Sequence, residues 1–297
     1  MNNLELVNKL YKPYRITKLN SCTIIDSLDG KFVLKPKGER DIKDLYSYLK
    51  SRGFNNYPNL VDSSRDAMNI YEYIDGSVYP KEQKASDLIK VASLLHNKTS
   101  YTKEVREDKF KEIYENIKNN LEYYKYEYTS YVDNIEEEIF MSPSHYLFIR
   151  NSSKLLNQIK FCETKLDEWY ESVKDKREIR VCTVHNNLSL EHFVKGDKEA
   201  LISWDKASTD SPILDIYELY QREWENVEFG SLLKEYLSHY PLKKEELDLL
   251  LIMLSMPKNV EFEKNEFKSC EKIGKVLDYV FKTEELVRPY YFTDDKV

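Results

Sequence analysis

Short runs of alternating apolar and polar residues follow one another through the first third of the chain. Such alternation, rich in β-branched residues, is typical of half-buried strands, and Leu28-Asp29-Gly30 carries the Asp-Gly signal of a hairpin turn. Residues 39–51 instead place apolar side chains at helical spacing and stop at Arg52-Gly53, which suits a helix C-terminus. The pattern predicts a five-stranded sheet with one helix, its strands at Arg15–Leu19, Thr23–Ser27, Lys31–Lys35, Leu60–Asp62 and Ala67–Ile74.

The spacing of apolar residues changes to that of long helices from about residue 81 onward. Helices are predicted over Ala85–Lys98, Lys109–Tyr126 and Tyr146–Asp175, and helical spacing returns after residue 215. Two brief apolar runs, Arg180–Val184 and Ala200–Trp204, flank a polar turn and predict a hairpin that carries a loop. The chain is expected to divide into a β-rich part, residues 1–76, and a helical part, residues 77–297, with the hairpin at 180–205.

Composition and charge exclude several classes of function. The 297 residues include 45 basic and 52 acidic side chains, a net charge of −7, and the interspersed charges offer no basic surface for nucleic acid. No run of about 18 apolar residues predicts a membrane span, and the N-terminal segment lacks the apolar core of a secretory signal, so we expect a cytoplasmic protein. Four widely spaced cysteines predict neither a disulfide framework nor a zinc site.

Six short motifs occur in order along the chain: Phe32–Lys35, Tyr71–Gly76, Ala92–His96, Val184–Phe193, Leu201–Asp205 and Ser211–Ile216. In this order they resemble the strand with the phosphate-binding lysine, the hinge, the LxxLH helix, the HGDxxxxN catalytic loop, the I-D-[FW]-[DG] metal-binding segment and the PxxDL helix cap of one superfamily. That superfamily is the aminoglycoside phosphotransferase/choline kinase-like (protein kinase-like) one.

This resemblance, which covers roughly residues 13–290, implies a fold class and a setting. It implies an α+β, two-lobed protein kinase-like fold of the aminoglycoside phosphotransferase type, with a small antiparallel β-sheet lobe ending in the hinge and a large, mainly helical lobe. The spacing around Leu49–Phe54 and the hinge is most similar to CotS-type spore coat proteins. That similarity implies a spore-forming bacterium, the mother-cell cytoplasm and spore coat as location, and spore coat proteins as partners.

The resemblance also assigns roles to nucleotide-binding residues. Lys35 takes the place of the phosphate-binding lysine, and the backbone of Glu72 and Ile74 that of the nucleotide-binding hinge. The acidic partner of Lys35 stays open among Glu39, Asp41 and Asp44. The loop Asn20-Ser21-Cys22 contains no glycine where backbone amides would approach phosphates. The sequence therefore predicts weakened binding of ATP and Mg²⁺ and assigns no cofactor.

The catalytic positions depart from the family pattern. In the loop that begins with His185, Asn187 stands at the base position, where its amide can orient a hydroxyl but takes no proton near neutral pH. His192 stands at the loop asparagine, although magnesium prefers oxygen ligands. Ser203 stands at the metal-binding aspartate, and Asp205, two residues later, can replace it only across a displacement of roughly 7 Å along the chain.

These departures predict a protein without physiological phosphotransfer. A missing general base costs a factor of about 10² to 10⁴ in rate. Loss of the metal's charge removes several kcal/mol more, because positioning and electrostatics supply nearly all catalysis of this reaction. His96 and His185 are expected to be core histidines that bond to the backbone or to Asp215, and Trp204 is expected to pack beside the cleft.

Three functional hypotheses remain open from the sequence. The first is a catalytically degenerate, CotS-type pseudokinase with a binding or scaffold role in spore coat assembly, and so no enzyme. The second is a divergent phosphotransferase with an alcohol group as acceptor, in which Asp205 holds the metal and Asn187 orients the acceptor. The third binds ATP without metal through Lys35 and the hinge. The sequence identifies no small-molecule acceptor, because substrate choice has no transferable code in such folds.

Overall fold

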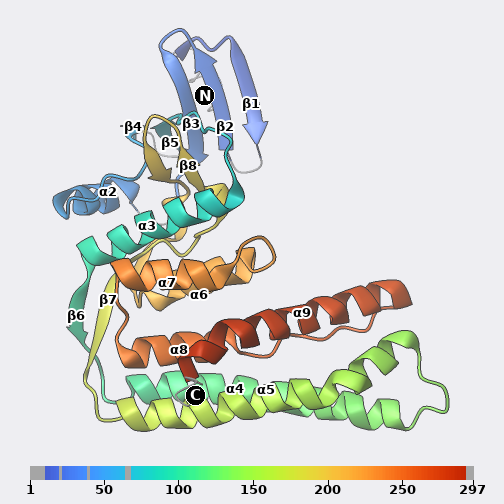
Figure 1. Cartoon of the computed structure of the whole chain (residues 1–297). Helices are drawn as coiled ribbons and strands as arrows, with labels where there is room; N and C mark the ends of the chain where they lie inside the picture. Colours follow the sequence, from blue (N-terminus) through green and yellow to red (C-terminus); the bar gives the residue numbers. More distant parts are fainter. Residues whose placement is uncertain (1–10, 20–21, 39–40, 64–67, 292–297) are drawn as a thin grey trace. The chain divides into compact units, whose positions relative to one another are not determined.

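The computed structural model describes residues 11–19, 22–38, 41–63 and 68–291 (Figure 1). The chain forms two compact units. Unit 1 contains Met1–Tyr101, Val181–Leu219 and Lys234–Tyr240, and unit 2 contains Thr102–Arg180, Tyr220–Leu233 and Pro241–Val297. The two units are groups of residues that pack closely with one another, and they do not test the expected boundary between residues 1–76 and 77–297. That boundary stays a prediction.

The N-terminal sheet has the five antiparallel strands that the alternation predicts. Its order is β1-β2-β3-β5-β4, and at the β2–β3 turn Ser27 pairs with Gly30, whose φ of +130° favours glycine. The side chain of Asp41 caps the following helix, and Gly53 ends it with a φ of +75°. The elements are β1 (Arg15–Leu19), β2 (Cys22–Ser27), β3 (Gly30–Pro36), α2 (Ile42–Ser51), β4 (Leu60–Asp62) and β5 (Met68–Glu72).

The predicted hairpin over residues 180–205 is wrong in its pairing. The strand β7 (Glu178–Val184) pairs with β10 (Ser208–Asp210), whereas β9 (Glu199–Leu201) pairs with β8 (Phe193–Lys195). Two 3-10 turns, Leu190–His192 and Trp204–Lys206, bend the chain away from the expected partner. Gly196 makes the β8–β9 turn possible, because a Cβ there would lie 2.0 Å from the carbonyl oxygen of Asp75.

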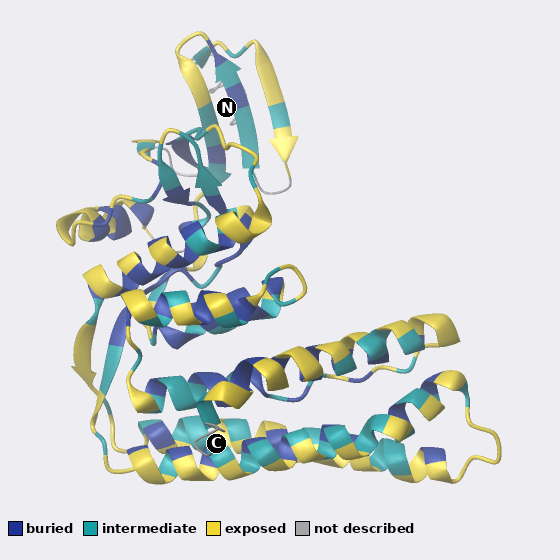
Figure 2. Ribbon diagram, in the orientation of Figure 1, coloured by how far each residue is buried: buried dark blue, intermediate teal, exposed yellow. Residues whose placement is uncertain are grey.

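The helices form where apolar residues recur at helical spacing, and they run longer than predicted. In unit 2, α5 packs against α4, α8 and α9 around a continuous core that includes Phe148, Leu155, Cys162 and Trp169 (Figure 2). The four cysteines, all within the described ranges, form no disulfide. The remaining elements are α3 (Lys81–Thr99), β6 (Tyr101–Glu104), α4 (Lys109–Glu136), α5 (Pro143–Val173), α6 (Ile213–Glu223), α7 (Phe229–His239), α8 (Lys244–Leu254) and α9 (Glu266–Tyr291).

Within the described ranges, none of the helices combines the length and the apolar character that crossing a membrane requires.

Candidate functional site

A cleft of about 490 Å³ in unit 1 collects most of the residues that the motifs single out. Its lining comes from strands β1, β2, β3 and β5, the segment that follows β5, Tyr46 of α2 and Pro58, and it is completed by residues within 191–194 and 202–205. Six predicted site residues line it: Lys35, Glu72, Ile74, His192, Ser203 and Asp205. Asn187 and His185 bond to residues of this lining. The Asn187 side chain donates to the carbonyl oxygen of Ser203, and the His185 ring bonds to the carbonyl oxygen of Ile202.

Lys35 contacts the segment that resembles the metal-binding motif. Its Nζ donates a 2.7 Å hydrogen bond to Oγ of Ser203 and lies 3.6 Å from a carboxylate oxygen of Asp205. Of the three acidic candidates from the sequence, Asp41 caps α2 instead, and Glu39 lies outside the described residues. Among the described residues, the ion-pair partner of Lys35 is Asp205, 170 positions along the chain and outside the helix that the sequence favoured.

The backbone around this contact is strained at Ser203. Its φ of +67° and ψ of +54° are left-handed, which costs an L-residue roughly 1–2 kcal/mol. The surrounding bonds hold this geometry, because Asn187 Nδ2 donates to the Ser203 carbonyl at 3.3 Å. His192 Nδ1 in turn donates to the Asn187 carbonyl at 2.8 Å, which leaves Nε2 as the acceptor or ligand atom of a neutral ring.

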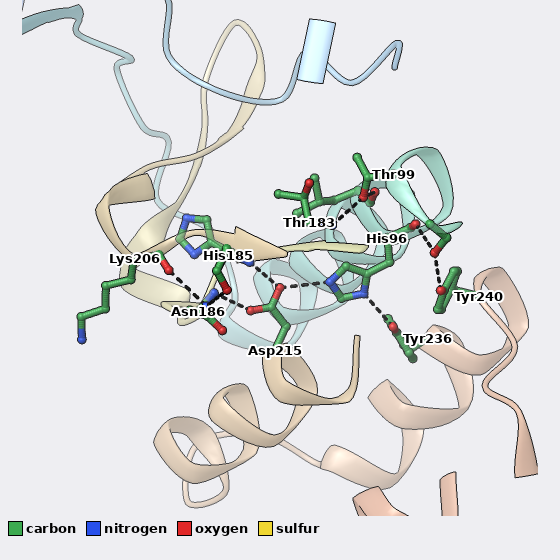
Figure 3. Close-up of polar contacts among 12 residues, drawn as sticks. His96, Thr99, Thr183, His185, Asn186, Lys206, Asp215, Tyr236 and Tyr240 are labelled. Atoms are coloured by element: carbon green, nitrogen blue, oxygen red, sulfur yellow. Dashed lines mark hydrogen bonds and ion pairs between the residues drawn. The ribbon is translucent and has the colours of Figure 1, made fainter. Parts of the chain in front are cut away.

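Asp215 anchors the catalytic-loop segment from below (Figure 3). Its carboxylate is fully buried and accepts the backbone N–H groups of His185 and Asn186, each at 2.7 Å. His96 Nε2 donates to the same carboxylate at 3.0 Å. The predicted core role of His96 and His185 is confirmed, and three donors compensate the cost of burying a charge.

A second set of polar contacts fixes the helix that carries His96 (Figure 3). Tyr236 of α7 lies 2.7 Å from His96 Nδ1, and its hydroxyl donates there when the ring is neutral. Thr99 accepts the backbone N–H of Thr183 in β7 at 3.0 Å. Sequence reasoning missed Tyr236, because a single tyrosine on a distant amphipathic helix carries no motif.

Aromatic side chains form one wall of the cleft. Trp204 is buried, as predicted, and its ring packs edge-on against Tyr46 and Tyr57. Burial raises the pKa of Tyr71 to about 12, and the nearby carboxylate of Asp205 adds to the effect. Burial, with the charges of Tyr71 and Asp205, also raises the pKa of Tyr46 well above its usual range. Both hydroxyls therefore remain protonated donors at neutral pH.

Glu72 at the predicted hinge already has partners within the protein. The backbone N–H of Glu72 donates to the carbonyl of Asn59 at 3.0 Å, so it is not available to a purine base. The Glu72 side chain accepts from Asn59 and pairs with Lys198. Burial alone would raise the pKa of Glu72, but its bonds to Lys198 and Asn59 outweigh that effect and lower the pKa.

The cleft's donor set does not fit a magnesium ion as the residues stand. Asp205 is paired with Lys35, and Glu72 is paired with Lys198. Across the described ranges, no three His, Cys, Asp or Glu side chains gather closely enough to hold a metal ion. Magnesium binds through carboxylates and phosphates in near-octahedral geometry, and the arrangement offers it no group of uncommitted carboxylates.

Comparison with known structures identifies the fold. The crystal structure of an aminoglycoside phosphotransferase from Alicyclobacillus acidocaldarius matches with a TM-score of 0.68 and 10% identity, over 93% of this chain and 90% of that one. The AMP-bound spectinomycin phosphotransferase APH(9)-Ia matches with a TM-score of 0.52 and 11% identity, over 98% of each chain. The chain therefore has the predicted α+β fold of the aminoglycoside phosphotransferase type, with a small antiparallel sheet and a larger helical region.

Comparison of the sequence with known families and proteins identifies no relative. No protein-family model matches the chain, and no curated protein matches it. At the identities of the structural matches, likeness establishes the fold alone. What the cleft does must therefore be argued from its own residues.

Proposed function

We propose that this chain is a catalytically degenerate, kinase-fold protein that works by binding rather than by phosphotransfer. The observation that carries the proposal is the contact of the Lys35 ammonium group with Ser203 and Asp205. In an active phosphotransferase, a lysine faces phosphate oxygens and a carboxylate holds magnesium. Here the lysine is held by the segment that would bind the metal, so each group satisfies the other.

The neighbouring positions support the same conclusion. Asn187 at the base position cannot accept a proton, and its amide donates to the Ser203 carbonyl. His192 offers one ring nitrogen where magnesium would prefer an oxygen. A nucleotide with its metal would have to break the Lys35 contacts, and both Asp205 and Glu72 are already paired with lysines.

We assign the binding role to spore coat assembly, with coat proteins as partners and the mother-cell cytoplasm and spore coat as location. Support for this assignment comes from the resemblance of Leu49–Phe54 and the hinge to CotS-type proteins. Deletion of the gene in the source bacterium should alter coat composition. Normal coat in the deletion strain would refute the assignment while leaving the biochemical proposal intact.

The second candidate is a divergent phosphotransferase with an alcohol group as acceptor. Two observations favour it: both structural matches above are phosphotransferases, and the Asp205 side chain is 41% exposed beside Lys35, within reach of a metal. In that case Asp205 would hold magnesium after releasing Lys35. The acceptor would be oriented by Asn187 without a general base.

An assay of phosphate release and transfer from ATP separates the two candidates. The purified full chain is incubated with ATP, Mg²⁺ or Mn²⁺ and a panel of hydroxylated acceptors, in parallel with Asp205→Ala and Lys35→Ala. We expect the same background rate for all three proteins. Metal-dependent turnover that disappears in both variants would establish the phosphotransferase and refute the degenerate kinase.

A further inference from the structure

Unit 2 contains a second cavity, of about 650 Å³, between the middle of α5, the end of α8 and the C-terminal half of α9. All of its lining residues belong to unit 2, so it is separate from the cleft of unit 1. Its volume falls in the range of about 300–1,000 Å³ that is usual for small-molecule sites. Neither the catalytic-loop motifs nor the proposed function accounts for it.

The body of the cavity is apolar. Phe161 of α5 faces Val280 and Val287 of α9 across it, and the two valines are also part of the buried core. Apolar walls of this kind gain free energy when an organic molecule displaces water from them. The walls alone select no particular ligand, so specificity must come from the polar groups.

One residue of the cavity lining, Gln158, has a buried polar atom without a partner among the described residues. Gln158 donates its amide hydrogen to the carbonyl of Ser255 at 2.9 Å, which fixes the side chain. Its Oε1 atom is buried and, among the described residues, accepts no hydrogen bond. A buried acceptor without a donor is destabilising, so this oxygen favours a ligand that brings an N–H or O–H group.

Charged residues at the rim favour an anion. Lys154 pairs with Glu284 at 3.3 Å, so these two charges offset each other. Arg288 lies one helical turn beyond Glu284 and is exposed, and no carboxylate of the described residues pairs with it. The net charge of the rim is therefore positive, and a guanidinium group suits carboxylate, sulfonate or phosphate oxygens.

We propose that this cavity binds a small organic anion with an apolar body and one hydrogen-bond donor. The apolar body lies between Phe161 and the two valines, the donor satisfies Gln158, and the anionic group pairs with Arg288. A cationic ligand would meet the uncompensated arginine, and a purely apolar ligand would leave the glutamine oxygen unsatisfied.

Anilinonaphthalene sulfonate is a suitable probe, because it combines aromatic rings, one N–H group and a sulfonate. Calorimetric titration of the full chain should show one saturable site. Arg288→Gln should weaken binding by roughly tenfold, since it removes a charge-assisted hydrogen bond. Glu284→Gln should tighten binding by roughly twofold to fivefold, since it releases Lys154 for the anion.

Lys160→Gln is the matched control, because it removes one positive charge from an exposed position of α5 that does not line the cavity. It should leave the affinity unchanged. Asn157→Trp, at an exposed position on the cavity lining, should abolish binding by filling the space. Unsaturable binding, or equal affinity for the Arg288→Gln, Glu284→Gln and control variants, would overturn the proposal and leave only an apolar surface.

Discussion

Two polar clusters of unit 1 lie close together and differ in almost every physical respect. Around Asp215, a fully buried carboxylate accepts three N–H groups, and its partner His96 is itself completely buried. Around Lys35, one ammonium group contacts a hydroxyl and a carboxylate at the edge of a cleft, with side-chain exposures of 17% for Lys35 and 41% for Asp205. The first cluster supports the loop, and the residues of the second line the cleft.

The difference separates the buried groups that hold the loop from the partly exposed groups that line the cleft. The buried cluster contains His96 and Asp215, and each polar atom named there has a partner. In the exposed cluster, Ser203 stands at the position where the sequence resemblance implies a metal-binding aspartate. Under the proposed function, the chain keeps the buried support of the loop while its cleft serves binding alone.

Disrupting the buried cluster should have the largest effect. Asp215→Asn places an amide N–H₂ group against donors that require an acceptor, so we expect a loss of about 3 kcal/mol in the free energy of unfolding. Denaturant titration of both proteins measures it. Asp197→Asn, an exposed carboxylate in the β8–β9 turn, is the matched control and should change stability by less than about 0.5 kcal/mol. Equal stability of Asp215→Asn and wild type would contradict the anchoring role.

Rebuilding the exposed cluster should restore metal-dependent nucleotide binding. Asn187→Asp, His192→Asn and Ser203→Asp together supply the groups that the family pattern requires, on a loop that Asp215 already holds. At ATP and Mg²⁺ concentrations of 100 times Kd, the gain in stability should be about 2.7 kcal/mol, which a thermal shift detects. Adding Lys35→Met should remove the gain. No response of the rebuilt variant would mean that these three positions do not explain the cleft.

Removing Lys35 from the natural chain should have a small effect. Lys35→Met keeps the apolar stem and loses a partly exposed ion pair, so we expect at most about 1 kcal/mol of lost stability. Denaturant titration of Lys35→Met and Asp215→Asn side by side compares their losses in the free energy of unfolding. A loss as large as that of Asp215→Asn would erase the distinction between the two clusters.

The smallest effect should come from Glu72 at the hinge, and it should depend on pH. Its bonds to Lys198 and Asn59 lower its pKa below the ordinary value of 4.5, so its contribution is present at neutral pH and is lost as the pH falls through the folded-state pKa. Glu72→Gln should cost less than about 1 kcal/mol at pH 7, and the difference from wild type should vanish in acid. Glu191→Gln, which removes an exposed carboxylate of the same cleft, is the matched control and should cost less stability than Glu72→Gln at pH 7.

The local parts of this architecture could be predicted from sequence. Alternation and the turn at Gly30 gave the N-terminal sheet, and helical spacing with a stop at Gly53 gave α2. His96 was expected in the core with the backbone or Asp215 as its partner, and the structure shows Asp215. Strands β8 and β10 could not be predicted in the same way, because three residues are too few to establish a period.

The partner of Lys35 could not be predicted for a different reason. Its contact with Asp205 joins β3 to a 3-10 turn far along the chain, and a left-handed residue at Ser203 positions that turn. The spacing of hydrophobic residues along the sequence does not predict a left-handed backbone conformation at a serine. The glycine-poor loop at Asn20 and Ser21 lies outside the described residues, so that expectation stays a prediction.

The central claim is that the cleft does not bind nucleotide through a metal, and thermal unfolding of the purified wild-type chain tests it most directly. The unfolding midpoint is measured with ATP, ADP and GTP, each with Mg²⁺, Mn²⁺ or EDTA. We predict the same midpoint in every condition, because Lys35 is held by Ser203 and Asp205 and the described residues of the cleft offer no group of carboxylates that could hold a metal ion. A rise in the midpoint that requires both nucleotide and metal, and that disappears in Asp205→Ala, would contradict the account.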